Sequence, residues 1–419
     1  MQAGHPVFLR AIFISEEENI MKKDKRKKIF ITSILMIVIV TSIMWIFLKI
    51  NNKAVEIQAS KSEFNTELEE NEHMHIEEDI NGEKVPVPNG YVGSRADGEN
   101  EIDTGYVIYE GTEEVNNENV EEAQRTRNQY VWIPVPDAST MYGTDENGKK
   151  WGKTYTFTLD TGSNIDEVTG AKPNWSELNG IMQTYGGEPN VVPKKNAEVY
   201  DMDSRIKNLY IGEETTHEFL IQMEKEFSQM IESVEKYGGF YIGRYETGIV
   251  NQEKLVIRKG ETNITGQSWY SIYSKSKSLK NENTNIETGL MWVNQKDRIL
   301  MWLIESGNKS KEEICKDSSG WGNYKNASFE YININGEKVT KESNVSERIP
   351  TGSSEYTKAN NIYDLAGNVS EWSMEGSNTY YRTHKGGNFI GDGNATQSQA
   401  FYPSSGASYI GSRAMLYIK

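Results

Sequence analysis

The segment NIYDLAGNVSEW, residues 361–372, concentrates chemically capable side chains in one short stretch near the end of the chain. Asp364 and Glu371 supply carboxylates, and a turn at Gly367 allows backbone carbonyls to point at the same centre. A hard cation such as Ca²⁺ takes about six to eight oxygen ligands of these kinds. The spacing therefore suits a calcium site. The alternative is a turn in which Asp364 and Asn368 accept hydrogen bonds from local backbone amides.

Few residues are available for other chemistry. Only His217 and His384 lie in the part expected to fold, which leaves little for a histidine-based triad or a multi-histidine metal centre. The motif HMH at residues 73–75 falls in an acidic stretch, where a solvated, adventitious metal site is expected. Cys315 is the single cysteine, so an intrachain disulfide and a thiolate zinc site are both excluded. We expect it to be an unreactive thiol in a polar loop rather than a nucleophile.

The charge of the chain excludes one class of partner. A formal net charge of -16 argues against nucleic-acid binding, which needs a basic face to displace counterions from phosphates. Much of the acid is local, because residues 51–83 hold ten acidic and two basic residues with almost no periodic apolar pattern. We therefore expect residues 50–84 to be a disordered acidic linker. The remaining chain, in a sequence of 36% hydrophobic residues, is long enough to bury a sizeable core.

The N-terminal region predicts a membrane anchor. Residues 29–48 are interrupted only by Thr and Ser and, as a helix, cover about 30 Å, the hydrocarbon thickness. The basic run KKDKRKK precedes them, so the positive-inside rule places residues 1–28 in the cytoplasm and the C-terminal domain outside the cell. A cleaved signal peptide has a shorter apolar core of about 7–15 residues, which favours an uncleaved signal-anchor over residues 29–49. Met21 stands just before the basic run, and we hypothesise that translation starts there.

Downstream of the linker, the pattern predicts short strands, loops and two helices. In the segment at residues 216–239 the apolar residues recur at steps of three and four, and Gly238 supplies a C-terminal stop. Asn335 and Gly336 supply the two positive-φ positions of a type I′ hairpin turn. Further expected features are short β-rich pieces in residues 85–127, strands in 128–136 and 238–248, an irregular insertion over 138–215, a helix over 293–308 and a hairpin over 329–340. Together these elements predict an irregular α+β domain.

The terminal motifs resemble the signature of the formylglycine-generating enzyme (sulfatase-modifying factor) family. In that family N-x-x-G-N-x-x-E-W is followed by R-G-G-S-W and then by G-F-R; here the corresponding segments are NIYDLAGNVSEW, HKGGNF at 384–389 and IGSRAMLYI at 410–418. The upstream segments YVWIPV, GGFYIGRYETG and WGNYKN match more loosely. The resemblance spans residues 128–419 in discontinuous pieces. It implies a C-type-lectin-like fold that has few short helices and strands and carries insertions. The predicted transmembrane helix precedes this domain.

The resemblance also implies a structural calcium site. The family's ligands fall on Asp364 and Glu371 through their side chains, and on Gly367 and Val369 through their backbone carbonyls. The family has Asn where Asp364 stands, and Asp keeps an oxygen ligand while adding charge.

The family's catalytic parts are not present. Its cysteine-oxidising enzymes bind copper with a pair of cysteines between the Gly-Gly element and the terminal Gly-x-Arg, and residues 390–412 contain none. Cys315 lies far upstream in the sequence. Ser370 stands where the family often has Trp, and Asn388 and Phe389 replace its Ser-Trp, so the substrate groove is altered too. The three-histidine iron site of the related sulfoxide synthases has no counterpart. Loss of catalysis is therefore expected.

These observations predict a membrane-anchored, extracytoplasmic binding module at a bacterial cell surface, which holds an extracellular protein or glycan ligand. Aromatic and amide side chains of the tail suit such a surface because they offer contact area and hydrogen bonds at low entropy cost. They are Tyr380, Tyr381, Phe389, Asn394, Tyr402 and Tyr409, and these loops are also candidates for sequence diversification. The alternative is a divergent, metal-dependent oxidative enzyme with a non-cysteine site. A third possibility is a scaffold that positions partners at the membrane.

Overall fold

The computed structural model describes residues 68–144, 150–153, 155–157, 171–173, 216–376 and 382–419. The chain divides into two compact units, Met1–Thr66 and Glu67–Lys419, and all described residues belong to the second. The predicted basic N-terminus at residues 1–28 and the anchor at 29–49 lie outside the described residues. In the part that is described, no helix is both long and apolar enough to cross a membrane.

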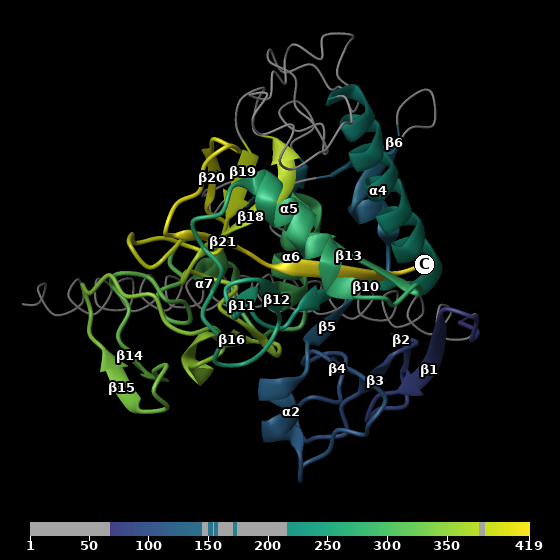
Figure 1. The fold of residues 1–419 in the computed structure, drawn as a ribbon, viewed down its shortest axis with the longest axis horizontal. Coiled ribbons are helices and arrows are strands. Elements are labelled where there is room, and N and C mark those ends of the chain that lie inside the picture. Colours follow the sequence, from purple (N-terminus) through teal and green to yellow (C-terminus); the bar gives the residue numbers. More distant parts are fainter. Residues whose placement is uncertain (1–67, 145–149, 154, 158–170, 174–215, 377–381) are drawn as a thin grey trace, which may run out of the picture. The chain divides into compact units, whose positions relative to one another are not determined.

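A six-stranded antiparallel sheet forms the centre of the second unit (Figure 1). Its strand order is β13-β22-β10-β5-β4-β3. The strands are β3 (Tyr91–Gly93), β4 (Val107–Glu110), β5 (Gln129–Pro134), β10 (Gly239–Gly243), β13 (Ile286–Leu290) and β22 (Ala414–Ile418). Every residue of β10 and β22 is buried, so both faces of the sheet are covered at its middle. The prediction of a mixed domain of short strands and few helices is confirmed at this level.

A second sheet of four strands carries the end of the predicted turn. Its order is β20-β19-β18-β21, and β18 pairs with β21 in parallel while the other pairs are antiparallel. The strands are β18 (Ser370–Gly376), β19 (Arg382–Lys385), β20 (Ser398–Phe401) and β21 (Ile410–Ser412). All of β19 is buried, whereas most of β20 is exposed. The sheet therefore runs from the interior to the surface.

Two longer helices pack on these sheets. Helix α4 (Thr216–Tyr237) ends where Gly238 adopts a positive φ of 74°, as the sequence predicts. Helix α6 (Val293–Glu305) contacts β5 of one sheet and β18 of the other, and it is buried from its start to Leu303. The shorter helices are α2 (Val120–Thr126), α5 (Trp269–Lys277), α7 (Lys311–Cys315) and the 3-10 turns η1 (Ala138–Thr140), η4 (Ser278–Lys280) and η5 (Glu355–Thr357). Thus α6 connects the two sheets.

Short strand pairs make up the remaining regular structure. They are β6 (Tyr142–Thr144) with β7 (Lys150–Gly152), β8 (Tyr155–Phe157) with β9 (Ala171–Pro173), β11 (Gly248–Val250) with β12 (Lys254–Val256), β14 (Phe329–Ile332) with β15 (Lys338–Lys341), and β16 (Lys358–Ala359) with β17 (Ile362–Tyr363). The β14–β15 pair confirms the predicted hairpin, but the type I′ turn is wrong. Only Gly336 has a positive φ, and the Asn333 side chain accepts from the Asn335 and Glu337 amides, which closes a longer loop.

The acidic segment folds further toward the N-terminus than predicted. The expected disordered linker covers residues 50–84, but the structure places part of it in a strand pair. The strands are β1 (Met74–Glu78) and β2 (Lys84–Pro88). Glu77 is buried, and its carboxylate accepts hydrogen bonds from the Gly93 amide at 2.8 Å and from Arg95 at 3.0 Å. Acidic residues with such partners can be buried, which the local composition of the sequence does not reveal.

Candidate functional site

The predicted turn is buried and needs unusual backbone conformations. Asp364, Gly367 and Asn368 have φ values of 57°, 75° and 55°. These lie in the left-handed region, which Gly, Asn and Asp adopt most readily. A Cβ atom on Gly367 would lie 2.4 Å from the Asn323 carbonyl oxygen, so only glycine fits there. Backbone geometry therefore accounts for part of the unusual composition of residues 361–372.

Glu371 lies between two buried cations. Its Oε1 accepts a hydrogen bond from Arg413 Nε at 2.6 Å, and its Oε2 accepts from Lys296 Nζ at 2.7 Å. All three side chains are buried. Arg413 also donates to the carbonyls of Gly243 and Tyr363, at 2.8 and 2.7 Å. The Glu371 carboxylate is thus fully paired within the protein.

Asp364 has different partners. Its Oδ2 accepts from the Gly352 amide at 2.7 Å and the Thr351 hydroxyl at 3.2 Å, while Oδ1 is buried without a partner. Burial raises the pKa of Asp364 above its usual range. Asn368 in turn accepts from the Ile349 amide at 3.1 Å. Of the two predictions for this segment, the turn held by backbone amides agrees better with the observed bonds. The amides come from the loop that precedes the turn and not from the turn itself.

The carboxylates among the predicted calcium ligands already have partners within the protein. A Ca²⁺ ion at Glu371 would meet the charges of Lys296 and Arg413, which already occupy both carboxylate oxygens. The amides of Gly367 and Val369 donate to Gly386 O and Glu246 Oε1, whereas the predicted ligand atoms are their carbonyls. Among the described residues, no group of three or more His, Cys, Asp or Glu side chains is placed to hold a metal. Calcium therefore stays a prediction.

The ion pairs extend along helix α6. Lys296 and its neighbour Asp297 each bond one strand of the four-stranded sheet, because Lys296 pairs with Glu371 of β18 and Asp297 pairs with Lys385 of β19 at 2.7 Å. Burial lowers the pKa of Lys296 to about 8. We call Lys296, Asp297, Glu371, Lys385 and Arg413 the α6 ion-pair network. Sequence reasoning missed its three cations and Asp297, since charged residues are usually exposed to solvent.

Burial sets the protonation state of both Cys315 and His384. The Cys315 carbonyl accepts a hydrogen bond from Asn394 Nδ2 at 2.8 Å. Cys315 therefore lies beside the C-terminal loops, although it is far from them in the sequence. Burial raises the pKa of the Cys315 thiol to about 11, which leaves it protonated at neutral pH. His384 is buried, and burial lowers its pKa to about 4. The side chain of His217 is outside the described part.

The described tail residues that were predicted for binding lie in the segments on either side of β20 in the sequence. We define the C-terminal surface as Phe389, Ile390, Asn394, Phe401, Tyr402 and Tyr409. Ile390 and Tyr402 are 44% and 52% exposed. In the described part of the chain, no strand pairs with the outer edge of β20. Asn394 differs from the prediction because its amide group bonds internally, to Cys315 and Thr396. Tyr380 and Tyr381 lie outside the described residues.

The backbone beneath this surface is held by hydrogen bonds. The amides of Gly266, Trp269 and Ser370 donate to the carbonyls of Ala407, Pro403 and Tyr409 at 3.0, 3.0 and 2.9 Å. The Phe401 ring packs beside that of Trp372, with 6.2 Å between centroids. The loop backbone is thus anchored while its outer side chains remain exposed.

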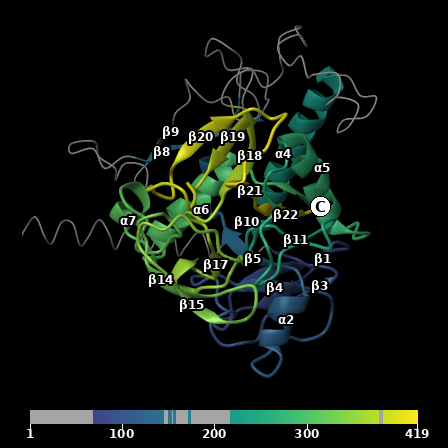
Figure 2. The same ribbon diagram turned by 60° about the vertical axis from the view of Figure 1, so that its left-hand side comes forward.

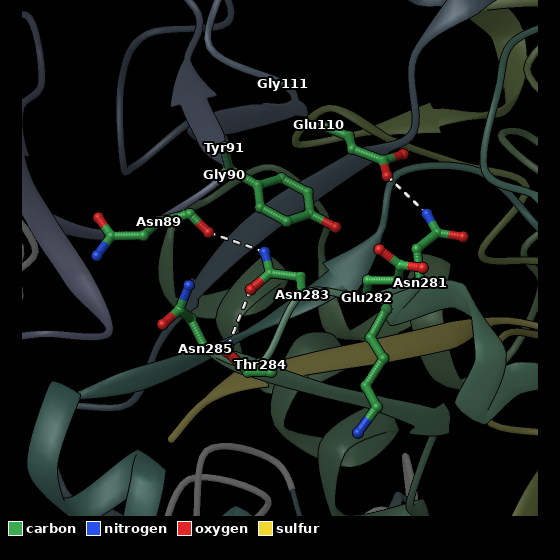
Figure 3. A pocket seen from close by; sticks show the side chains of 11 residues that line it. Asn89, Gly90, Tyr91, Glu110, Gly111, Asn281, Glu282, Asn283, Thr284 and Asn285 are labelled. Carbon is green, nitrogen blue, oxygen red and sulfur yellow. Dashed lines mark hydrogen bonds between the residues drawn. The ribbon is translucent and has the colours of Figure 1, made fainter.

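A polar pocket lies on the other sheet (Figure 3). Residues 89–91 and 110–111 form one wall, residues 280–285 form the other, and the enclosed volume is about 490 Å³. Sequence reasoning did not identify it. Its main signal in the sequence is the asparagine-rich run NENTN at residues 281–285.

Comparisons with known proteins add little to this geometry. No family model and no curated protein matches the chain. Among solved structures, a chain described as Treponema denticola variable protein 1 matches with 12% sequence identity and a TM-score of 0.16, over 66% of this chain and 98% of that chain. A TM-score this low carries no argument about fold or function. The functional argument therefore depends on the residues themselves.

Proposed function

We propose that this chain is a membrane-anchored, extracytoplasmic binding module on a formylglycine-generating-enzyme-like, C-type-lectin-like domain, and that its C-terminal surface holds an extracellular protein partner. The observation that carries the proposal is the exposure of β20 and its flanking loops. An unpaired strand edge beside exposed apolar side chains suits an extended protein segment, which adds main-chain hydrogen bonds to the edge. The exposed Ile390 and Tyr402, in the segments before and after β20, add apolar contact for such a partner.

The buried turn supports loss of the family's chemistry. Its carboxylates are paired or hydrogen-bonded inside the protein, and Cys315 has no second cysteine to bind copper with. A divergent oxidative enzyme would need a metal. Stoichiometric copper or iron in the purified full-length protein would contradict the proposal.

Membrane anchoring rests on the apolar run at residues 29–48, and topology labelling tests it. In a Cys315→Ser background, Ile334→Cys places a thiol at an exposed hairpin position. A membrane-impermeant maleimide should label this variant on intact cells. Lys25→Cys, in the basic segment, should be labelled only after permeabilisation. Equal labelling of both variants on intact cells would contradict the proposed orientation.

Binding is tested by cross-linking from the surface itself. A photo-reactive amino acid at the exposed Gln399 of β20 should give a discrete cross-linked partner on intact cells, whereas the same group at the exposed Ile334 should not. Adding Ile390→Ser to the Gln399 variant should reduce the product. Identical product patterns from both positions would show collision rather than binding.

A further inference from the structure

The polar pocket is separate from the C-terminal surface. Its walls come from β3, β4 and the segment before β13, all on the six-stranded sheet side, whereas β20 ends the other sheet. Figures 1 and 2 both show β3 and β4 well apart from β20. A volume of about 490 Å³ lies within the range of about 300–1,000 Å³ usual for small-molecule sites.

Hydrogen bonds within the walls fix the pocket before any ligand binds. Asn283 Nδ2 donates to the Asn89 carbonyl at 2.8 Å, and Asn283 Oδ1 accepts from the Asn285 amide at 2.9 Å. Asn281 Nδ2 donates to Glu110 Oε1 at 2.8 Å and so links the two walls (Figure 3). Gly90 has a φ of 93°, and a Cβ atom there would lie 2.8 Å from Asn283 Nδ2. Glycine therefore lets the walls approach.

The balance of charges in the pocket disfavours anionic ligands. The Glu110 carboxylate accepts from two neutral amides, Asn281 at 2.8 Å and Asn128 at 2.7 Å, while Arg127 donates to the backbone carbonyl of Glu110 at 2.6 Å. Glu282 adds a second carboxylate to the lining. Lys280 also lines the pocket, and its ammonium pairs with Glu287 at 2.7 Å, a carboxylate that Lys419 contacts as well at 2.8 Å. The lining thus carries two carboxylates and one ammonium that is already paired, and this balance disfavours a phosphate or a sugar acid.

The hydroxyl of one buried tyrosine is aimed into this space. Tyr91 is 3% exposed, and within the described structure its hydroxyl makes no hydrogen bond. Figure 3 shows the ring between the two walls, with its hydroxyl directed toward Asn281 and Glu282. Burial raises the pKa of Tyr91 well above its usual value, so the group remains both a donor and an acceptor. A ligand hydroxyl would satisfy it.

We propose that this pocket binds one or two units of a neutral saccharide, with Tyr91 and Asn281 as the principal ligand contacts. Sugar hydroxyls both donate and accept, which matches a lining of amides, a phenol and carboxylates. The prearranged walls reduce the ordering cost of binding. The site is independent of the C-terminal surface, so either can fail without the other.

Saturation-transfer NMR on the full-length protein in lipid nanodiscs, without glycoside detergents, tests this proposal. The probes are maltose, cellobiose and N,N′-diacetylchitobiose, with glucuronate and glucosamine as charged counterparts. At least one neutral disaccharide should bind with a dissociation constant of about 1 mM, and glucuronate should not bind. The polysaccharide built from the disaccharide that binds is then tested in the same way. Binding of the polysaccharide would assign the pocket to a cell-surface glycan, and failure to bind would assign it to a free sugar. Either result supports the proposed chemistry.

Matched variants locate the binding. Tyr91→Phe keeps the ring beside Tyr130 and removes only the hydroxyl, so it should fold with an unchanged melting temperature and weaken binding about fivefold, the loss expected for one hydrogen bond. Asn281→Ala should weaken binding similarly. Tyr409→Phe, on the C-terminal surface, should leave it unchanged. Absence of binding by every neutral disaccharide, equal binding by the Tyr91 and Asn281 variants, or preferential binding of glucosamine would each overturn the proposal.

Discussion

The turn at residues 361–372 leads into β18, and β20 is the edge strand of the same four-stranded sheet. The polar side chains of the turn bond within the protein, whereas those of β20 are exposed to solvent. In the turn, Glu371 has two buried cations as partners, and Asp364 and Asn368 bond backbone amides. Along β20, Ser398 and Gln399 face solvent. The comparison teaches that a high density of polar residues does not identify a ligand site. What matters is whether those groups already have partners inside the protein.

The largest expected effect comes from removing the centre of the α6 ion-pair network. Glu371→Ala leaves Lys296 and Arg413 buried and unpaired, and breaking a buried pair in this way costs about 3–5 kcal/mol. Urea unfolding measures the loss. The control is Glu330→Ala, which breaks an ion pair with Lys338 of the same 2.6 Å length but with both side chains more than 60% exposed. It should cost about 1 kcal/mol or less. Similar losses of unfolding free energy in the two variants would contradict the view that the buried ion pairs of Glu371 differ from an exposed one.

Acid should destabilise the protein through His384. Burial lowers its pKa from 6.5 to about 4, so above pH 6.5 the ring is neutral in both folded and unfolded states. As the pH falls from 6.5 toward 4, the unfolded state binds the proton first, and stability falls by on the order of 3 kcal/mol. His384→Phe keeps an aromatic ring beside Trp372 and removes the titration. The difference between wild type and variant should therefore depend on pH in this window, and a constant difference would exclude the mechanism.

Calcium separates the two explanations of the turn. An ion at a hundred times its dissociation constant would add about 2.7 kcal/mol to stability. Because Lys296 and Arg413 already neutralise Glu371, we expect melting curves with calcium and with a chelator to coincide. A calcium-dependent rise that disappears in Glu371→Asp, which shortens the side chain but keeps its charge, would instead support the calcium site that the family resemblance implies.

Sequence periodicity predicted the elements that depend on local pattern. Helix α4 and its stop at Gly238 follow from apolar spacing and a residue that tolerates positive φ. The role of Glu371 did not follow, because its partners stand 75 positions before it and 42 positions after it in the sequence. Burial of Glu77 was missed for the same reason, since Arg95 compensates it from another strand region. Local patterns therefore predict elements, whereas long-range partners decide which charges become buried.

The smallest stability effect should accompany the clearest loss of binding. Ile390 is 44% exposed, so Ile390→Ser should change the free energy of unfolding by about 0.5 kcal/mol or less, as surface substitutions usually do. The same change removes an apolar contact beside β20 and should reduce cross-linking from Gln399. Ile334→Ser, on the exposed β14–β15 loop, is the matched control and should alter neither quantity. A large loss of stability in Ile390→Ser would assign this side chain to packing, because a residue reserved for a partner contributes to binding without supporting the fold.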